Sequence, residues 1–318
     1  MITRDILKRW QVKKMYDVLI AGGGPAGLTA GIYAARGGLS VLIIERAFAG
    51  GQMALSYIIE NYPGFDEDTE GAAIAHRMRK QAERMGAAFT TETIKSFELS
   101  GEVKKIVTSK NTYEAKTVIL AMGALPKHVG IPGENNFAGA GVSYCATCDG
   151  AFFKNADVAV IGGGNTAVED ALYLSQFARK VYLVHRRDQF RAQKALVENA
   201  RKVENIEFVL SYIPLRIEGE FSAKQLVVEH TQTKETKVLD VTGVFVAIGQ
   251  IPRTELVDGA VGLTADKYID ADETCTTNIP GVFCAGDIRK KELRQIVTAV
   301  SDGAVAASKA ELYILSEK

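Results

Sequence analysis

Short apolar runs that end at glycine-rich turns recur along this chain. The first run, Tyr16–Ala21, is followed by the turn GGGPAG at 22–27 and by an alanine-rich stretch that reaches about Arg36. A short apolar run bounded by glycine is typical of a buried strand, and the longer stretch after the turn is typical of a helix. A second apolar run, Val41–Ile44, ends at Glu45. The pattern predicts a strand, a turn, a helix and a strand, which together form a βαβ unit.

The same pattern recurs in the middle of the chain. The run Asp157–Ile161 leads into the turn GGGNTA at 162–167, a helical stretch to about Phe177, and a strand at Val181–Val184 that ends at His185. An internal repeat of this kind predicts two copies of one architecture. One glycine turn is a weak indication of a nucleotide site, but two turns in full strand–turn–helix context favour it strongly.

Each copy closes with an apolar strand followed by glycine and proline. Val118–Ala121 leads into MGALP at 122–126, and Val244–Ala247 leads into IGQIP at 248–252. Glycine followed by proline is typical of a chain leaving a sheet. A helical pattern from about residue 293 to 314 then remains, and this tail is too short to form a domain of ordinary size.

These features predict an α/β fold with two Rossmann-like, three-layer ββα dinucleotide-binding domains, the second inserted into the first. We expect residues 1–127 and 252–318 to form the first domain, which is discontinuous. We expect residues 128–251 to form the second domain, which carries the cysteine motif described below.

The glycines of the two turns have separate physical roles. The first glycine permits the tight turn, a later one lets the backbone approach a pyrophosphate, and the last small residue lets helix and strand pack closely. The pyrophosphate then lies at a helix N-terminus, where unpaired N–H groups favour anions. The residues in these roles are Gly22, Gly24 and Gly27 in the first turn, and Gly162, Gly164 and Ala167 in the second.

The residue that ends each second strand distinguishes the two nucleotides. Glu45 lies 21 positions after Gly24 (45 − 24), where a carboxylate accepts a hydrogen bond from a free ribose 2′-hydroxyl, as in FAD or NAD. His185 holds the same position in the second copy (185 − 164) and is followed by three arginines, Arg186, Arg187 and Arg191. Guanidinium groups bind a 2′-phosphate well, so we predict NADPH there. The alternative interpretation is a solvated basic run.

Two cysteines with C-x-x-C spacing, Cys145 and Cys148, precede the second glycine turn and are followed by Asp149. Such a pair closes a small ring reversibly, which suits thiol–disulfide exchange. Half of a zinc site and an inert buried pair are the alternatives. Zinc would need two further ligands, and since there is no second close cysteine pair and the histidines are scattered, we predict no metal. Cys284 is predicted to be a core residue, and no function is assigned to Cys275.

The composition narrows the class of protein. Apolar residues make up 47% of the chain and charged residues 24%, as in soluble globular proteins. The 38 lysines and arginines balance the 38 acidic residues, which gives no overall footprint for nucleic acid or an anionic membrane. No apolar run approaches the length of a membrane helix, and Met1–Lys14 lacks the apolar core of a signal peptide. We expect a cytoplasmic protein that binds neither nucleic acid nor membranes.

With these motifs in place, the sequence resembles the low-molecular-weight NADPH-dependent thioredoxin reductases, which are class II pyridine nucleotide-disulfide oxidoreductases. The resemblance runs from about Met15 to the end and is carried by CATCD at 145–149, GGGNTA at 162–167, HRRD at 185–188 and PGVF with AGD within 280–287. It implies a homodimer in which electrons pass from NADPH through FAD to the Cys145–Cys148 pair, and on to thioredoxin or a thioredoxin-like protein.

The resemblance also implies roles for individual residues. Cys148 is similar to the family thiol that faces the flavin, Cys145 to the thiol that attacks thioredoxin, and Asp149 to the acid that protonates the departing thiolate. The residues that look like FAD contacts are Gly22, Gly24, Pro25, Ala26, Gly27, Glu45, Arg46, Gly51, Gln52, Asn61, Gly123, Gly286, Asp287, Arg294, Gln295 and Ile296. Those that look like NADPH contacts are Gly162, Gly164, Asn165, Thr166, Ala167, His185, Arg186, Arg187 and Arg191.

Three rival functions share part of this pattern. A ferredoxin–NADP reductase of similar fold would keep both glycine turns but lack the dithiol. A flavin thioredoxin reductase fed by another electron donor would lack the arginines after His185. A nucleotide-binding sensor without enzymatic activity would need no C-x-x-C motif beside the second turn.

Overall fold

A computed structural model describes residues 15–56, 58–65, 67 and 69–317 of the chain. The chain divides into two compact units, which we call the first unit (Met1–Leu125 with Pro252–Lys318) and the second unit (Pro126–Ile251). The two connections between them, β7 (Ala124–Pro126) and β16 (Gln250–Pro252), pair with each other as a two-stranded sheet. The charged segment Met1–Lys14 lies outside the described residues.

The first unit is built on a seven-stranded sheet. Its parallel part has the order β3-β2-β1-β6, and β17 continues it beside the second half of β6. The first half of β6 pairs instead with β5, which with β4 forms an antiparallel extension. The elements are β1 (Met15–Ala21), α2 (Pro25–Arg36), β2 (Val41–Glu45), η1 (Gly51–Leu55), α3 (Gly71–Arg84), β3 (Ala88–Thr91), β4 (Ile94–Glu98), β5 (Lys104–Thr108), β6 (Thr112–Leu120), β17 (Val282–Cys284) and α7 (Ile296–Ser316).

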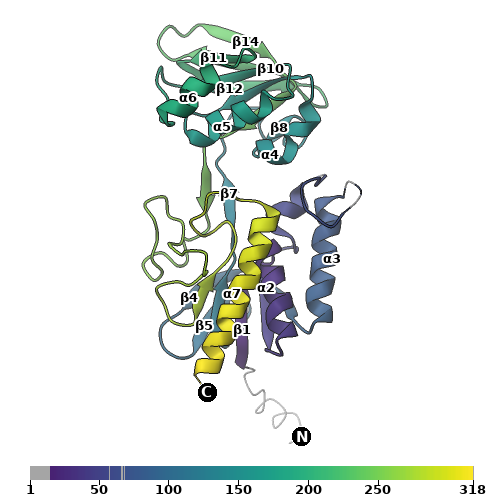
Figure 1. Ribbon diagram of the computed structural model, residues 1–318, viewed down its shortest axis with the longest axis vertical. Coiled ribbons are helices and arrows are strands. Elements are labelled where there is room, and N and C mark those ends of the chain that lie inside the picture. Colours follow the sequence, from purple (N-terminus) through teal and green to yellow (C-terminus); the bar gives the residue numbers. More distant parts are fainter. Residues whose placement is uncertain (1–14, 57, 66, 68, 318) are drawn as a thin grey trace, which may run out of the picture. The chain divides into compact units, whose positions relative to one another are not determined.

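Both faces of the sheet are buried at its centre, which explains why β2, β17 and the second halves of β1 and β6 are continuously apolar. On β1, Val18 and Ile20 face the helices, where α2 and the long α7 lie side by side (Figure 1). Leu19 and Ala21 face the opposite layer, which includes the antiparallel extension and the segment around Val257. The alternation follows from the two-residue period of a strand.

The second unit repeats this plan. A five-stranded parallel sheet has the order β11-β10-β9-β15-β8, and a separate antiparallel sheet has the order β12-β13-β14. The elements are β8 (Val142–Ser143), α4 (Ala146–Asp149), η2 (Gly150–Phe153), β9 (Asp157–Ile161), α5 (Asn165–Leu174), β10 (Lys180–His185), α6 (Lys194–Arg201), β11 (Ile206–Leu210), β12 (Tyr212–Gly219), β13 (Ala223–His230), β14 (Thr236–Asp240) and β15 (Gly243–Val246).

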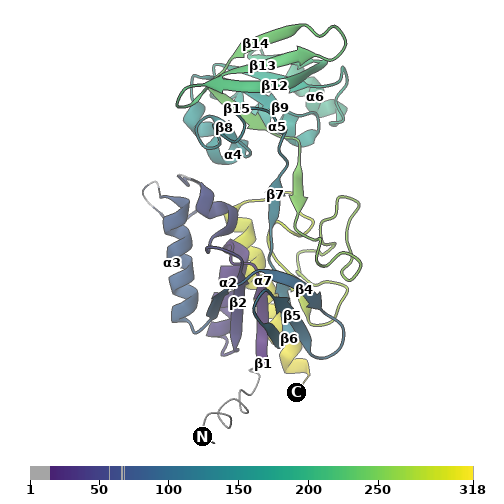
Figure 2. The ribbon, with the colours of Figure 1, turned by 180° about the vertical axis from the view of Figure 1, so that it is seen from behind.

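Three layers are therefore present in the second unit. Val158 and Val160 of β9 pack against the helical layer, whereas Ala159 and Ile161 pack toward the antiparallel sheet. Figure 1 shows α5 and α6 in front of the parallel sheet, and Figure 2 shows the antiparallel strands on its other side. The predicted α/β class with Rossmann-like ββα architecture is confirmed.

Some helix limits differ from the expected ones. The helix α7 begins at Ile296, three residues later than the apolar pattern indicated, and α5 ends at Leu174 instead of about Phe177. Gln295 and Thr298 explain the first difference, because their side chains and backbone N–H groups form a reciprocal capping box. Among the described residues, no helix is long and apolar enough to cross a lipid bilayer.

Candidate active site

The two cysteines of the C-x-x-C motif form a disulfide in the second unit. Their Cα atoms are 5.3 Å apart, and the backbone between them makes one helical turn, α4, that begins after Cys145. The N–H groups of Cys148 and Asp149 both donate to the carbonyl oxygen of Cys145, at 3.3 and 3.1 Å. This tight turn keeps the two sulfur atoms close, as reversible thiol–disulfide chemistry requires.

Asp149 ends this turn and is partly enclosed by the protein. Burial raises the pKa of its carboxyl group, and a hydrogen bond from the Ser143 hydroxyl, 2.6 Å from Oδ2, opposes that rise. A carboxyl group with a raised pKa holds its proton at higher pH, which suits a proton donor.

The first glycine turn lies at the end of β1. Gly22 has a φ of +110°, and a Cβ there would lie 2.3 Å from the carbonyl oxygen of Ala121, so only glycine fits. A Cβ at Gly27 would lie 1.9 Å from the carbonyl oxygen of Gly22. A Cβ at Gly24 meets nothing closer than the Cα of Gly51, at 4.0 Å. The turn is thus packed from behind and open at Gly24, where α2 begins without a side-chain cap.

Glu45 is fixed against this turn by its carboxylate. Oε2 accepts a hydrogen bond from the N–H of Gly23 at 2.8 Å, and Oε1 accepts one from the N–H of Arg46 at 2.7 Å. A Cβ at Gly23 would lie 3.0 Å from the Cβ of Glu45. The middle glycine therefore makes room for the residue that ends the second strand, a role that the sequence interpretation missed.

An unsatisfied acceptor lies at the start of the last segment of the first unit. Oδ1 of Asp287 is buried without a hydrogen-bond partner in the described part of the chain, and burial raises the pKa of this carboxyl group. A buried acceptor without a donor is costly. A ligand rich in hydroxyl groups, such as the ribityl chain of FAD, would satisfy it.

Further predicted FAD contacts come together from distant parts of the first unit. Asn61 donates to Oε1 of Gln295 at 3.0 Å across 234 positions of sequence. The guanidinium group of Arg294 lies 4.1 Å from the centre of the Tyr268 ring, and its Nε is buried without a partner. The remaining predicted FAD contacts lie on α2, between β6 and β7, on η1, at the turn before Asp287 and at the start of α7: Pro25, Ala26, Gly123, Gly51, Gln52, Gly286 and Ile296.

The second glycine turn repeats the geometry of the first. A Cβ at Gly162 would lie 2.4 Å from the carbonyl oxygen of Ala247 and 2.6 Å from the Cβ of Ala167, whereas a Cβ at Gly164 would meet nothing within 4 Å. The turn ends at Asn165, whose Oδ1 accepts the N–H of Gln193 at 2.9 Å, and Thr166 follows in the first turn of α5. As in the first turn, the backbone at Gly162 is packed against neighbouring residues and the backbone at Gly164 is open.

His185 lies beneath this turn. Its ring is buried and stacks on Phe190 at 5.1 Å, and a Cβ at Gly163 would lie 2.1 Å from the ring. Burial lowers the pKa of His185, and the nearby arginines lower it further. The imidazole is therefore a neutral spacer at pH 7. The positive charge of the site comes from three exposed side chains, those of Arg186, Arg187 and Arg191.

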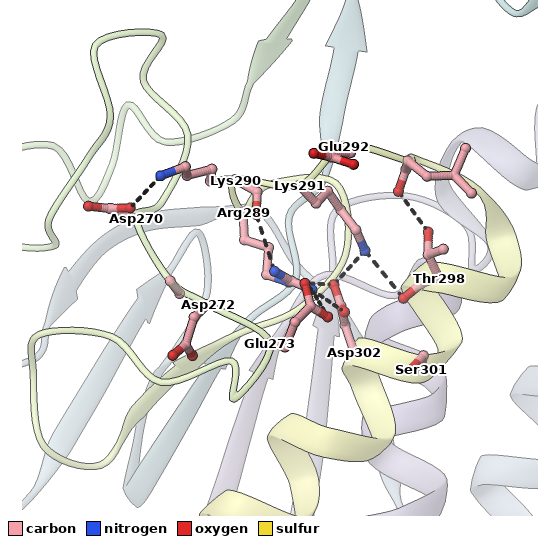
Figure 3. Close-up of a pocket in the computed structure, with 12 residues that line it drawn as sticks. Asp270, Asp272, Glu273, Arg289, Lys290, Lys291, Glu292, Thr298, Ser301 and Asp302 are labelled. Carbon is pink, nitrogen blue, oxygen red and sulfur yellow. Dashed lines mark hydrogen bonds and ion pairs between the residues drawn. The ribbon is translucent and has the colours of Figure 1, made fainter.

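A buried group of charges in the first unit was not anticipated from the sequence. Asp302 of α7 accepts hydrogen bonds from Arg289 at 2.8 Å and Lys291 at 2.7 Å (Figure 3). It also accepts one from the backbone N–H of Gly286 at 2.9 Å. Together with the exposed Glu273, these side chains line a cavity of about 640 Å³. Because Gly286 immediately precedes Asp287, the group fixes the turn that carries the unsatisfied carboxylate. The signal for it in the sequence was an acidic residue among the small and apolar residues in the first half of α7.

The other two cysteines are buried in the first unit. Cys284 lies in β17 within the core, which confirms the sequence interpretation, and burial raises its pKa. Cys275 is buried as well, its Sγ lies 3.6 Å from the carbonyl oxygen of Asp302, and burial raises its pKa to about 12. Both are inert thiols at neutral pH. The described residues hold no group of three or more side chains suited to binding a metal ion.

Comparisons with known proteins agree with this geometry. A model of the pyridine nucleotide-disulphide oxidoreductase family matches residues 16–303. The thioredoxin reductase of Mycolicibacterium smegmatis is 45% identical over 304 residues, which are 95% of this chain and 98% of that protein. The bifunctional thioredoxin reductase/thioredoxin of Mycobacterium leprae is 44% identical over 302 residues, which are 94% of this chain and 66% of that protein.

Among solved structures, the thioredoxin reductase of Streptococcus pyogenes matches with a TM-score of 0.90 at 43% sequence identity. The match covers 96% of this chain and 99% of that chain. Similarity in sequence and in fold thus extends over nearly the whole chain.

Proposed function

Since the chain belongs to the thioredoxin reductases of the pyridine nucleotide-disulphide oxidoreductase family, we propose that it reduces thioredoxin or a thioredoxin-like protein with electrons from NADPH, by way of FAD and the Cys145–Cys148 pair. The overall reaction consumes NADPH, one proton and a protein disulfide, and yields NADP⁺ and a protein dithiol. The observation that carries this proposal is the disulfide itself, in the same unit as a glycine turn flanked by three exposed arginines.

FAD belongs to residues 1–127 and 252–318 on this proposal. The open turn at Gly24, at the uncapped start of α2, suits a pyrophosphate. The carboxylate of Glu45 suits a ribose hydroxyl, and the unsatisfied Oδ1 of Asp287 suits the ribityl chain. Arg294 brings a second unsatisfied buried group to the same unit.

NADPH belongs to residues 128–251. Gly164 leaves space for the pyrophosphate at the start of α5. Arg186, Arg187 and Arg191 supply charge for the 2′-phosphate, and the backbone N–H of Arg191 donates to the carbonyl oxygen of Gly163 at 2.8 Å. That bond ties the third arginine to the turn. A nucleotide that lacks the phosphate would leave the arginines without a ligand.

The chain's own chemistry is thiol–disulfide exchange. Bound together, FAD and NADPH supply the hydride transfer and the two electrons that open the Cys145–Cys148 disulfide. The Cys145 thiolate then attacks the partner's disulfide and forms a mixed disulfide, while the partner's second sulfur leaves as a thiolate. The Cys148 thiolate attacks Sγ of Cys145, which restores the internal disulfide and releases the reduced partner. Asp149, with its raised pKa, donates a proton to a departing thiolate.

The partner and the assembly follow from the family and from the surface. In the Mycobacterium leprae relative, thioredoxin reductase and thioredoxin are named on one chain, which supports thioredoxin as the acceptor. We propose a homodimer, since the exposed face of α7 carries Val297, Leu312 and Leu315, and a second copy would cover them. We propose a cytoplasmic location, where unpaired thiols such as Cys275 and Cys284 stay reduced.

One experiment tests the function. The purified protein should be yellow with bound FAD, and NADPH should bleach the flavin absorbance without oxygen. With oxidised thioredoxin added, NADPH oxidation should continue until the thioredoxin disulfide is consumed. The Cys145→Ser variant should keep its FAD and its oxidation of NADPH by a small acceptor, but lose thioredoxin reduction.

The controls separate the rival functions. A yellow protein that NADPH does not reduce, but a low-potential donor does, would identify a reductase fed from another source. NADPH-driven bleaching without thioredoxin reduction would exclude the proposed acceptor. A colourless protein that takes up no FAD would refute the proposal as a whole.

A further inference from the structure

A buried hydroxyl group contacts both ends of the C-x-x-C turn, which runs from Cys145 to Asp149. Ser143 is the last residue of β8 and is only 5% exposed. Its Oγ accepts a hydrogen bond from the N–H of Cys145 at 3.1 Å and donates one to Oδ2 of Asp149 at 2.6 Å. The same hydroxyl thus contacts the residue at the start of the turn and the carboxyl group at its end.

The backbone around Ser143 is held by the sheet. Ser143 is paired with Phe245 of β15, one of the largest fully buried side chains. On the far side of the turn, a Cβ at Gly150 would lie 3.0 Å from the side chains of Leu174 and Phe177, so the end of α5 and the segment after it pack tightly there. The hydroxyl therefore projects from a fixed strand toward a fixed turn.

The bridge does not depend on the sulfur–sulfur bond. Opening the disulfide removes the covalent link between Cys145 and Cys148, but the bonds of the Ser143 hydroxyl involve only the backbone of Cys145 and the carboxyl group of Asp149. Because no sulfur atom takes part in these bonds, we expect them to hold Asp149 beside the cysteines in the dithiol as well.

We propose that Ser143 is a positioning residue for dithiol–disulfide exchange, which holds the Asp149 carboxyl group at the turn and stabilises the carboxylate left after proton donation. The inference rests on the proposed function. In the step concerned, a cysteine sulfur leaves a disulfide with the electron pair of the broken bond, and the proton of Asp149 moves to it. The products are a thiol and a carboxylate, and the Ser143 hydroxyl donates to the new negative charge.

Protonation of Asp149 then depends on two opposing influences. Burial raises the pKa of Asp149 and the hydrogen bond from Ser143 lowers it. Without the hydroxyl, the pKa should rise further. The helices packed against α4 are η2, which has no titratable side chain, and α5, whose titratable groups are Glu169, Asp170 and Tyr173. Burial raises the pKa of Asp170 to about 7, so the Asp170→Asn variant is needed to separate its titration from that of Asp149.

The test compares Ser143→Ala with Ser143→Thr, which keeps a hydroxyl, and with Ser175→Ala. Ser175 is a matched control because it lies in the same unit and its hydroxyl donates to the carbonyl oxygen of Leu172, not to a group of the C-x-x-C turn. The turnover number with thioredoxin is measured from pH 5.5 to 9.5 in the FAD-loaded enzyme. Reduction of a small acceptor, which does not use the dithiol, reports whether each variant is folded and loaded.

Ser143→Ala should lower the turnover number by about tenfold, the lower end of the effect of a hydrogen bond to a charged group. Its KM for thioredoxin should not change, and the alkaline fall of its pH profile should move to higher pH, because a carboxyl group with a higher pKa keeps its proton longer. Asp170→Asn should leave that shift in place. Ser143→Thr should recover most of the turnover number.

The outcomes are separable. If the unaltered enzyme does not reduce thioredoxin, the proposed function fails and the inference fails with it. If the unaltered enzyme is active and Ser143→Ala matches it in turnover number and pH profile, or loses no more than Ser175→Ala, the inference is overturned and the function stands. If Ser143→Ala lowers activity further in an Asp149→Asn background, the hydroxyl does not act through Asp149, and the inference is overturned as well.

Discussion

Replacing Asp302 with asparagine should test the buried charge group of the first unit. In the native chain one carboxylate accepts hydrogen bonds from Arg289, Lys291 and the backbone of Gly286. The Arg289 and Lys291 side chains are 2% and 5% exposed, so water does little to stabilise them. Asparagine keeps the shape and one acceptor oxygen, but it removes the only buried negative charge among these contacts.

The expected loss is about 3–5 kcal/mol, the cost of removing one partner of a buried ion pair and leaving the other charged. Glu273 also contacts Arg289, but its side chain is 89% exposed, so it compensates little. For a domain of about 150–250 residues, each kcal/mol lowers the melting temperature by about 2–4 °C. The variant should therefore melt about 6–20 °C lower than the unaltered protein.

Asp258→Asn is the matched control. Asp258 pairs with Lys267 at 2.9 Å, but the side chains are 52% and 62% exposed. An exposed pair of this kind contributes about 0–1 kcal/mol, so this variant should melt within about 4 °C of the parent. Both are measured by calorimetry at one fixed excess of FAD. An Asp302→Asn variant that melts no lower than Asp258→Asn would refute the reasoning.

The pH dependence gives a second check on the same variant. Burial raises the pKa of Asp302, but the hydrogen bonds from Arg289 and Lys291 outweigh burial, so the pKa is lowered overall. A lowered pKa means that the carboxylate stabilises the fold above the unfolded value, about 3.9, and loses this effect as pH falls through the folded value. The difference in stability between the two proteins should thus be full at pH 7 and shrink only below about pH 4.

Three further predictions concern the second unit. Arg186→Ala should raise the KM for NADPH about ten- to a hundredfold and leave the KM for NADH almost unchanged; equal effects on both donors would contradict the phosphate assignment. Cys148→Ser should trap a mixed disulfide between Cys145 and thioredoxin, which a non-reducing gel detects, and Cys145→Ser should not. The reverse pattern would show that Cys148, not Cys145, attacks thioredoxin. Gly163→Ala should force the ring of His185 aside at a cost of about 1–3 kcal/mol, which weakens NADPH binding in a titration while FAD is retained.

The local pattern of the sequence was enough to predict both βαβ units. The strand β9 spans the predicted Asp157–Ile161, and α2 ends at the predicted Arg36. These limits are readable because glycine flanks both ends of α2 and follows β9, and because a short apolar run before the turn is typical of a strand whereas a longer stretch after it is typical of a helix. Cys284 was assigned to the core for the same reason.

Contacts between distant segments could not be read in this way. Asn61 meets Gln295 across 234 positions, and no local period relates them. Asp302 contacts Arg289 and Lys291 because α7 packs against the loop that connects it to β17. The start of α7 was misplaced because its capping box uses Gln295 and Thr298, the reverse of the common order of residue types in this motif.

The middle glycine of each turn links the local sequence pattern to a contact between distant segments. Gly23 and Gly163 each face the residue that ends the second strand, so the identity of that residue sets the charge behind the turn. In the first unit it is the carboxylate of Glu45, which accepts the N–H of Gly23. In the second unit it is the ring of His185, whose lowered pKa keeps it uncharged.

A carboxylate at position 185 would lie beside Arg186 and Arg187 and neutralise part of the charge that the proposed 2′-phosphate needs. A protonated histidine would add charge but would have to be hydrated, and this side chain is buried against Phe190. A neutral ring avoids both costs, because it fills the space beside Gly163 and leaves the arginines as the charged groups of the site. On the proposed function, the preference of each turn for its own nucleotide follows from exchanging a charged hydrogen-bond acceptor for an uncharged spacer at one position of the repeat.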